Sequence, residues 1–366
     1  MLKRKSLPEL YQISKVINAT AEMEIELLDN YYQHQINYIN YPDPTNLYKI
    51  NPGHITRRYL YQVQIDEHIG QNVDCGKIIT AQIKREFKQI LKKFSNTMAQ
   101  TWADCGLIKG VTLKLALKPG STPFKYAPYK TAYKHMDEIE RQCNKLLEAG
   151  FIIPSNSNYS SPVLMVPKKR IGDNVLEWRM CIDYRRLNSM TIKDHYPLPN
   201  IQSIYRKFAG NYYFTSLDLR HAYHHIAIRE QDRHKTAFIT HKGLFEWTRM
   251  TFGFANAPSA FQRAINYVLR DLEFVIVYLD DILILSKTEK EHIQHLRLIF
   301  QRLSEYNLKL RLDKCKFFKK ELNYLGFILT PDGVKPDPKY IEKVIALQPP
   351  TDNPSLLRVL GMINWL

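Results

Sequence analysis

Apolar residues recur at helical spacing in four segments of the chain, and each segment is predicted to be an amphipathic helix. At about 3.6 residues per turn, the apolar side chains of each segment fall on one face. Gly150 suits the position just after a helix end, and Pro258 is tolerated in a first helical turn. The four predicted helices are residues 81–94, 135–150, 258–272 and 289–307.

Shorter β-prone runs lie between the last three of these helices and are predicted to be strands. Residues 161–169 and 177–188 form two such pieces, separated by a polar turn at 172–174. Phe274–Tyr278 and Ile282–Leu285 form two more, so the residues between them fall at the connection of a hairpin. The mixture predicts an α+β fold from about residue 111 onward.

Two adjacent acids, Asp280 and Asp281, occupy the connection of this apolar hairpin. A bare carboxylate in a low-dielectric interior is unfavourable, and two like charges side by side are more so. No Lys or Arg lies between Glu273 and Ser286, so the compensating charge must come from elsewhere in the fold or from a metal ion. Asp218 ends another β-prone segment. One acid plus an adjacent pair, each at a strand end, suits two divalent cations about 3.5 to 4 Å apart, as in nucleotidyl transfer. A solvated turn is the alternative.

Composition and charge narrow the class of protein. The chain has 366 residues, of which 45% are hydrophobic and 12% aromatic, which predicts a globular protein. Its formal charge of +16 favours a polyanionic partner such as nucleic acid, although an anionic membrane surface would attract it too. No run of about 18 apolar residues occurs, so no membrane association is expected. The five cysteines form no C-x-x-C pair, which favours a reducing intracellular setting over a zinc knuckle or a disulfide framework.

Residues 1–110 are predicted to be an N-terminal extension or linker, to which no chemistry is assigned. The tripeptides Asp74-Cys75-Gly76 and Asp104-Cys105-Gly106 faintly resemble the Asp-Thr/Ser-Gly turn of aspartic proteases. Both lack the hydroxyl residue, so two ordinary turns are the simpler interpretation.

Ten sequence blocks occur in a fixed order along the rest of the chain: SPVLMVPKK, WRMCIDYRRLN, YPLPNI, SLDLRHAYHHI, KTAFIT, FGFANAPSAFQ, VYLDDILILSK, KCKFF, YLGFILTPDG and KPDPKYIEKV. In this order and spacing, the region from about Val111 to Leu366 resembles the reverse transcriptases of gypsy-type LTR retrotransposons. The resemblance implies a right-hand polymerase fold with an antiparallel palm sheet. Fingers are expected mainly in residues 111–210, the palm with a primer-grip hairpin mainly in 211–330, and the start of a thumb in 331–366.

The resemblance also implies a catalytic centre. Asp218, Asp280 and Asp281 match the three metal-binding acids of the palm, and the Leu219 carbonyl is an expected further ligand. The implied cofactor is a pair of Mg²⁺ ions, for which Mn²⁺ can substitute. One ion would lower the pKa of the primer 3′-hydroxyl, and the other would bind the triphosphate and stabilise the leaving pyrophosphate.

Nucleotide contacts are implied for Lys168 and Arg179 of the fingers, whose cationic groups suit phosphate oxygens. Tyr223 matches the aromatic residue that excludes a 2′-hydroxyl, with a plain core aromatic as the alternative. Backbone amides of the linker at Arg220 and His221 are expected to bind the triphosphate. The remaining implied contacts are Phe252 and Gly253 with the nucleotide, and Gln262, Tyr278, Leu325, Gly326 and Phe327 with template or primer.

Some positions depart from the family pattern. Thr251 stands where Pro is usual and His225 where Gln is common, and Arg220 and His221 replace smaller residues. The histidines at 221, 224 and 225 also have a spacing that suits zinc, but a tight turn beside a magnesium site disfavours this.

The predicted function is RNA-directed DNA polymerisation, in which deoxynucleoside triphosphates extend a DNA primer on an RNA or DNA template. The chain is expected to bind RNA–DNA duplex inside the cell, in the cytoplasm or in element particles there, with access to the nucleus left open. RNase H and integrase signatures do not occur in these residues, so a truncated or co-opted copy that binds nucleic acid without synthesis is an alternative. An RNA-dependent RNA polymerase is disfavoured by Tyr223.

Overall fold

The computed structural model describes residues 73–76, 79–171, 174–200, 204, 207–347 and 349–363. The chain divides into two compact units, residues 1–67 and 68–366, and every described residue belongs to the second. Most of the predicted N-terminal extension, residues 1–72, lies outside the described residues. Among the described helices, none is long and apolar enough to span a bilayer.

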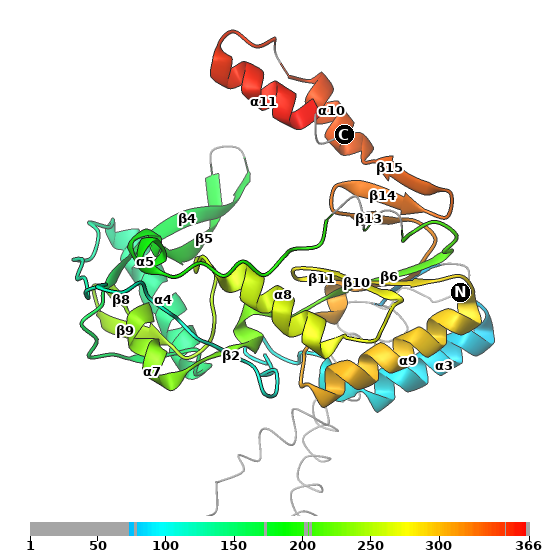
Figure 1. The fold of residues 1–366 in the computed structure, drawn as a ribbon, viewed down its shortest axis with the longest axis horizontal. Coiled ribbons are helices and arrows are strands. Elements are labelled where there is room, and N and C mark those ends of the chain that lie inside the picture. The colour runs from blue at the N-terminus through cyan, green and yellow to red at the C-terminus, as the bar shows by residue number, and fades with distance from the viewer. Residues whose placement is uncertain are drawn as a thin grey trace, which may run out of the picture. The chain divides into compact units, whose positions relative to one another are not determined.

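Five strands form a central sheet in the spatial order β1-β12-β6-β11-β10, of which Figure 1 labels β6, β11 and β10. Neighbouring strands are antiparallel except β1 and β12, which are parallel. The strands β12, β6, β11 and β10 are antiparallel, as the resemblance predicted, and the N-terminal edge strand β1 adds one parallel pair. The strands are β1 (Asp74–Cys75), β6 (Tyr213–Asp218), β10 (Val275–Tyr278), β11 (Asp281–Ser286) and β12 (Lys316–Lys319).

The strands β10 and β11 form the predicted hairpin, and the two residues Leu279 and Asp280 connect them. Leu279 has a φ of 54°, in the left-handed region that residues other than glycine seldom adopt. Ile282, Leu283 and Ile284 are all fully buried. Since successive side chains of a strand point to opposite faces, both faces of the sheet are covered, which explains the continuous apolar run in the sequence.

Two helices, α3 (Ala81–Lys93) and α9 (Glu289–Glu305), lie side by side on one face of the central sheet (Figure 1). Both confirm predicted helices. The Phe87 ring of α3 packs 4.8 Å from the Phe317 ring of β12, between ring centroids. Thr288 begins α9 with a reciprocal capping box. The N-terminal elements β1 and α3 therefore build part of the central sheet and its helical layer.

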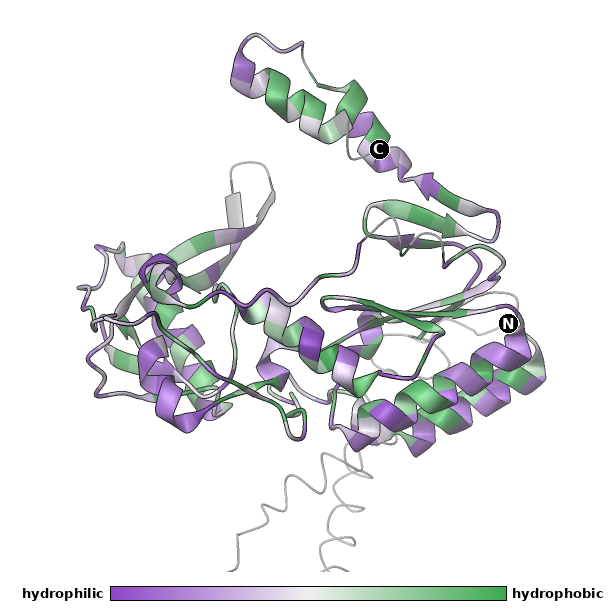
Figure 2. Ribbon diagram, in the orientation of Figure 1, coloured by the Kyte–Doolittle hydropathy of each residue, from purple (hydrophilic) through white to green (hydrophobic). Residues whose placement is uncertain are grey.

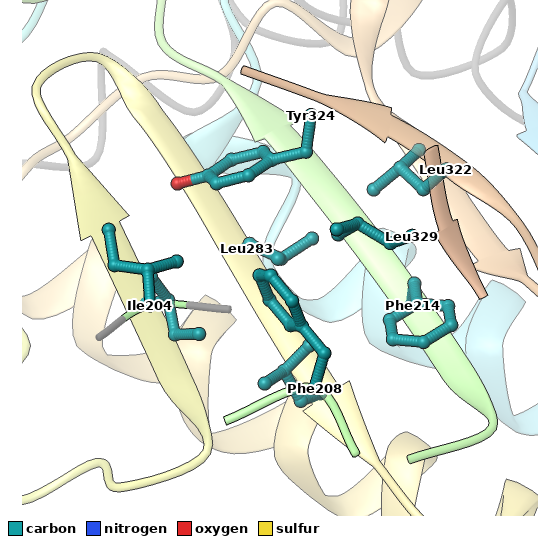
Figure 3. Close-up of a cluster of buried hydrophobic side chains, with 9 residues drawn as sticks. Ile204, Phe208, Phe214, Leu283, Leu322, Tyr324 and Leu329 are labelled. Atoms are coloured by element: carbon teal, nitrogen blue, oxygen red, sulfur yellow. The ribbon is translucent and has the colours of Figure 1, made fainter. Parts of the chain in front are cut away.

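The other face of the central sheet carries a buried cluster and a small three-stranded sheet, β13-β14-β15. Figure 3 shows Phe214 and Leu283 of the central sheet packed with Tyr324 and Leu329 of the small sheet. Leu325 and Gly326 connect the first two strands with φ values of 48° and 82°, as in a type I′ turn, which confirms the predicted hairpin. The strands are β13 (Leu322–Tyr324), β14 (Phe327–Thr330) and β15 (Gly333–Pro336).

A second five-stranded sheet has the order β3-β9-β8-β4-β5. The predicted helix α4 (Tyr133–Glu148) precedes it, and Gly150 follows that helix with a φ of 66°, as expected of a residue just past a helix end. The strands are β3 (Ile152–Pro154), β4 (Ser161–Ile171), β5 (Asn174–Ile182), β8 (Phe238–Thr240) and β9 (Gly243–Trp247).

The predicted strand at residues 177–188 is wrong in its second half. β5 ends at Ile182, and Arg185–Met190 form the short helix α5. The Asp183 carboxylate accepts a hydrogen bond from the Arg185 amide at 3.1 Å, a local bond that turns the chain out of the strand.

Figure 2 shows hydrophilic and hydrophobic residues interleaved along α3 and α9, as expected of helices with one buried face.

Further helices and short strands connect these layers. Helix α8 confirms the prediction of a helix near Pro258, which lies in its first turn. The remaining helices and strands are η2 (Ser95–Thr97), β2 (Thr112–Leu113), η3 (Ala222–His225), β7 (Ala227–Ile228), α7 (Glu230–Arg233), η4 (His234–Thr236), α8 (Ala257–Val268), η5 (Leu312–Lys314), α10 (Pro338–Ile345) and α11 (Asn353–Ile363).

Candidate active site

Asp218 and Asp281 are direct partners in the antiparallel ladder between β6 and β11. Opposed residues of such a ladder point to the same face, which here is the face that carries Phe214 and Leu283. Asp280 is the neighbouring turn residue and is exposed. The fold therefore brings the three predicted acids to one end of the central sheet, although Asp218 and Asp280 are 62 residues apart in sequence.

The three acids affect one another electrostatically. Asp281 is exposed at its surface, but desolvation, together with the charges of Asp280 and Asp218, raises its pKa to about 6. Burial also raises the pKa of Asp218, while Lys314 and Arg311 act in the opposite direction. These two cations come from the segment just before β12, so part of the compensating charge does come from elsewhere in the fold.

Carboxylate oxygens are the donors that Mg²⁺ prefers, so the chemistry of the three acids fits this ion. In the part of the chain that the structure describes, however, no group of three or more His, Cys, Asp or Glu side chains stands close enough together to hold a metal ion. Two of the three candidate zinc ligands already use a ring nitrogen: His225 Nε2 accepts a hydrogen bond from the Lys309 amide, and His224 Nδ1 contacts the Met250 carbonyl. These contacts disfavour the zinc alternative.

The linker after Asp218 is paired with the segment at 309–311. The Arg311 amide donates to the Asp218 carbonyl and the Arg220 amide donates to the Lys309 carbonyl, both at 2.8 Å. Leu219 lies between these two hydrogen bonds and faces Leu310. Leu219 and Leu310 form an antiparallel pair that exchanges no backbone hydrogen bond. The Arg220 amide is thus occupied within the chain, whereas the sequence predicted that amides of this linker bind triphosphate.

The side chains of Arg220 and His221 both carry a buried nitrogen. Arg220 Nε and His221 Nε2 have no hydrogen-bond partner among the described residues. The His221 ring packs against Trp102, 5.2 Å away between ring centroids. Two buried donor or acceptor atoms without a partner, in the linker that follows Asp218, mark a place where a polar ligand would be favourable.

Tyr223 is half-buried and lies beside the acids. Its ring centroid is 4.7 Å from that of Phe252 and 5.5 Å from that of Phe261. Burial raises the Tyr223 pKa, and the nearby charge of Asp280 adds to the rise. Phe252 is 61% exposed, so this aromatic pair has one open side. The structure thus brings the predicted sugar-selecting residue, a predicted nucleotide contact and an acid together.

Asn188 holds the loop that carries Phe252 and Gly253. Its side-chain amide donates to the Gly253 carbonyl, and its side-chain oxygen accepts from the Ala255 amide, both at 2.8 Å. Gly253 has a φ of 96°, which glycine adopts without strain. The sequence did not single out Asn188, because nothing in its local pattern shows a contact 65 residues away.

Gln262, a predicted template contact on α8, is fully buried beneath the acid hairpin. Its side-chain oxygen accepts a hydrogen bond from the Leu279 amide at 2.7 Å, and its Nε2 donates to the Val277 carbonyl at 3.2 Å. Nε2 also donates to Asn266 Oδ1 at 2.9 Å. The side chain therefore bonds to the end of β10 and to the first residue of the turn that leads into Asp280.

Lys168 and Arg179 lie on the two strands of the β4–β5 hairpin and are exposed. Lys168 is the extra residue of a β-bulge, because Pro167 and Lys169 pair with the consecutive residues Trp178 and Glu177. The Lys168 ammonium lies 2.5 Å from the Glu177 carboxylate, an exposed pair of little energetic consequence. The structure thus places both predicted cations on one hairpin, and pairs Lys168 with an acid of that hairpin.

The small sheet contacts the acid hairpin directly. The Tyr324 hydroxyl, next to the Leu325–Gly326 turn, lies 3.5 Å from the Asp281 carbonyl oxygen, to which it donates a long hydrogen bond. Tyr278 and Leu325 pack against the same buried cluster, and Phe327 is buried in β14. The predicted primer-contacting residues therefore gather beside the acids.

Residues 166–329 match the family model described as reverse transcriptase (RNA-dependent DNA polymerase). All of the predicted site residues fall within this range. The chain is 42% identical over 247 residues to a retrovirus-related Pol polyprotein from transposon 297 of Drosophila melanogaster, covering 67% of this chain and 23% of that protein. It is 36% identical over 276 residues to the polyprotein of transposon gypsy from the same organism, covering 74% of this chain and 26% of that protein. The chain thus spans about a quarter of the length of these relatives.

Solved structures agree on the fold. The foamy viral protease-reverse transcriptase in complex with an RNA/DNA hybrid matches with a TM-score of 0.70 at 24% identity, covering 83% of this chain and 40% of that one. The native protease-reverse transcriptase of prototype foamy virus matches with a TM-score of 0.62 at 26% identity, covering 83% and 40%. Fold and site together define a right-hand polymerase domain. The chain belongs to the reverse transcriptases of LTR retrotransposons, as the resemblance to gypsy-type elements predicted.

Proposed function

We propose that the chain is an RNA-directed DNA polymerase that adds deoxynucleotides to a primer 3′-hydroxyl during retrotransposon replication. The observation that carries the proposal is the pairing of Asp218 with Asp281 beside Asp280, within residues that match the reverse transcriptase family. In this assignment the central sheet is the palm, residues 111–210 are mainly fingers, and residues 331–366 begin the thumb. The site of action is the cytoplasm, where an element particle would form.

Asp218, Asp280 and Asp281 would hold two Mg²⁺ ions, together with the Leu219 carbonyl, and Mn²⁺ would substitute. When bound, such ions lower the pKa of the attacking hydroxyl and stabilise charge on the phosphates. The raised pKa of Asp281 and the repulsion among the acids support the proposal, because a cation there would relieve that repulsion.

The incoming nucleotide would lie against Tyr223 and Phe252, with Lys168 and Arg179 of the fingers contacting its triphosphate. A ring at Tyr223 leaves no room for a 2′-hydroxyl, so deoxyribose is preferred and the product is DNA. The buried nitrogens of Arg220 and His221 support a polar ligand at this end of the sheet. Gly253 lets the loop backbone approach the nucleotide closely.

Template and primer would lie along the palm, with the primer strand against Leu325, Gly326 and Phe327. Gln262 and Tyr278 would act on the duplex through the hairpin that they support. The formal charge of +16 suits the phosphate backbones of an RNA template, a DNA primer and their duplex. Since phosphate contacts carry no sequence information, binding would be salt-dependent and nearly sequence-blind.

A second candidate function is nucleic-acid binding without synthesis. The observation that favours it is that the acids, as they stand, do not converge on a metal position within the described residues. In that case the chain would bind duplex through its basic surface but would not extend a primer.

Primer extension on a poly(rA)/oligo(dT) duplex with dTTP and Mg²⁺ separates the two functions. The parent chain is expected to extend the primer, while a double variant with Asp280→Asn and Asp281→Asn is expected to bind the duplex equally well without extending it. Duplex binding by both chains and extension by neither would overturn the polymerase assignment and favour the binding function.

A further inference from the structure

His225 is fully buried at the end of η3, where three segments of the chain meet. Its Nε2 accepts a hydrogen bond from the Lys309 amide at 3.0 Å. Because an amide can only donate, Nε2 is the unprotonated nitrogen, and Nδ1 carries the ring proton. Nδ1 lies 3.2 Å from the Ala222 carbonyl, to which it donates. One neutral ring thus ties η3 to the segment at 309–311.

The third segment comes from the N-terminal region. The Ile108 amide donates to the His225 carbonyl at 2.8 Å. The Cys105 sulfur lies 3.6 Å from His225 Nδ1 and 3.5 Å from the Arg220 carbonyl oxygen. Residues 105–108 therefore contact both ends of the linker that follows Asp218.

Arg249 fastens this third segment. Its Nη1 donates to the carbonyls of Cys105 at 2.9 Å, Gly106 at 2.7 Å and His224 at 3.1 Å. Gly106 allows this segment to approach the backbone of Asn307 closely, because a Cβ atom at position 106 would lie 1.7 Å from the Asn307 carbonyl oxygen. No side chain other than hydrogen fits there without a backbone shift.

The supported linker connects the first acid to the aromatic residue at the nucleotide position. It runs from Leu219 to Tyr223, and His221 within it has a φ of 51°, in the left-handed region. Such a backbone conformation persists only where its surroundings hold it. The Lys309 carbonyl holds the linker at Arg220, and the His225 ring holds its far end.

We propose that His225 is a positioning residue that fixes the turn at residues 219–223 for the incoming nucleotide, with residues 105–108 completing the support. The inference rests on the proposed polymerase function, which it deepens. It gives the N-terminal segment a role in nucleotide binding. His225 need not touch the nucleotide, since it acts through the Ala222 carbonyl and the backbone between Asp218 and Tyr223.

Two substitutions separate positioning from simple stability. His225→Leu removes both ring hydrogen bonds, whereas His225→Gln offers an oxygen to the Lys309 amide and an amide group to the Ala222 carbonyl. His292 is the matched control, because it is fully buried and its ring contacts two hydroxyls, of Thr215 and Ser286, at 2.7 Å on the helical face of the sheet. Single-nucleotide incorporation then gives KM for dTTP and kcat for each variant.

The proposal expects His225→Leu to raise the KM for dTTP by about tenfold or more, since two hydrogen bonds of about a factor of five each are lost. Duplex affinity should be unchanged, and His225→Gln should restore the parent KM. His292→Leu should lower the melting temperature without changing the KM. Equal KM values for the parent and His225→Leu would overturn the proposal. It would also be overturned if both leucine variants lost activity only in proportion to their loss of stability.

A readout without catalysis keeps the inference separate from the polymerase assignment. Amide hydrogen exchange in His225→Leu should be faster in residues 219–226 and 308–311 than in the parent, and unchanged in α9. Failure of the parent to incorporate dTTP would refute the proposed function, while the exchange result would still decide the role of His225. Unchanged exchange in both segments would overturn the support described for the turn.

Discussion

The side-chain oxygen of Gln262 accepts a hydrogen bond from the backbone amide of Leu279 at 2.7 Å. Leu279 is the strained residue of the two-residue turn that leads into Asp280, with a φ of 54°. The bond crosses from α8 to the acid hairpin, so the position of the acids depends on a residue far from them in sequence. A buried amide with such partners fixes backbone geometry more than it contacts ligands.

Replacing Gln262 should therefore reduce catalysis more than duplex binding. Gln262→Leu removes the bond to Leu279 and is expected to lower the rate of primer extension by about tenfold, with a loss in stability of about 1 to 3 kcal/mol for the unpaired amide. Steady-state extension and duplex titration measure the two effects.

Gln142→Leu is the matched control, because the Gln142 amide makes the same two types of bond in the second sheet. It accepts from the Met180 amide at 3.0 Å and donates to the Trp178 carbonyl at 2.9 Å. This variant should lose similar stability but retain extension. If both variants lose activity equally, the specific role of Gln262 is refuted.

Sugar selection should depend on the ring of Tyr223. Tyr223→Ala removes the ring that packs on Phe252 and is expected to raise incorporation of UTP relative to dTTP by about tenfold or more, because the obstacle to the 2′-hydroxyl is gone. Tyr223→Phe keeps the ring and should keep the preference for dTTP. Ratios of kcat/KM for the two nucleotides measure the effect. A parent-like ratio in Tyr223→Ala would refute this role.

Stability should fall as the pH is lowered, in part because of buried histidines. Burial, with a smaller effect from the charge of His295, lowers the pKa of His292 to about 3, whereas the ordinary histidine pKa is about 6.5. Between these two values the unfolded chain binds a proton that the folded chain does not. The stabilisation is therefore complete above about pH 6.5 and is lost as the pH falls toward 3, by at most about 1.4 kcal/mol per pH unit.

Urea unfolding at a series of pH values tests this dependence. His292→Gln cannot titrate and can still bond Thr215 and Ser286, so its free energy of unfolding should fall less steeply between pH 6.5 and 4 than that of the parent. Comparison of the two chains isolates His292 from the acids, whose titration is common to both. Parallel curves would show that His292 is not a neutral buried group.

The N-terminal helix α3 should be part of the folded palm. Phe87 is 2% exposed, and Phe87→Ala is expected to destabilise the domain by about 3 to 5 kcal/mol through the cavity that it leaves. Phe252→Ala is the matched control, because Phe252 is 61% exposed and the same substitution there should cost little stability. A loss below about 1 kcal/mol for Phe87→Ala would contradict the packing of α3 on the sheet.

Local patterns predicted the elements that depend on local physics. The periodicity of α3, α4 and α9 and the paired apolar runs of β10 and β11 were sufficient, because each element buries one regular set of side chains. The end of β5 was predicted too late, since a single side chain, Asp183, turns the backbone there. The parallel pairing of β1 could not be predicted from two residues without an apolar run.

Non-local contacts at the site were beyond sequence reasoning. The position of the acids at strand ends singled them out in the sequence, but the register that pairs Asp218 with Asp281 comes only from the sheet. Gln262 was predicted to contact template, and only the structure shows its bond to Leu279. The support of the linker by Cys105 spans 115 residues, a separation that no local pattern encodes.

We expect an RNA template to direct DNA synthesis through Asp218, Asp280 and Asp281. The most direct test supplies one deoxynucleoside triphosphate at a time, with Mg²⁺, to a DNA primer on four RNA templates that differ only in the next base. The parent should add only the complementary nucleotide on each template, and Asp218→Asn should add none while it still binds the duplex. Addition that ignores the template base, or equal addition by parent and Asp218→Asn, would contradict this expectation.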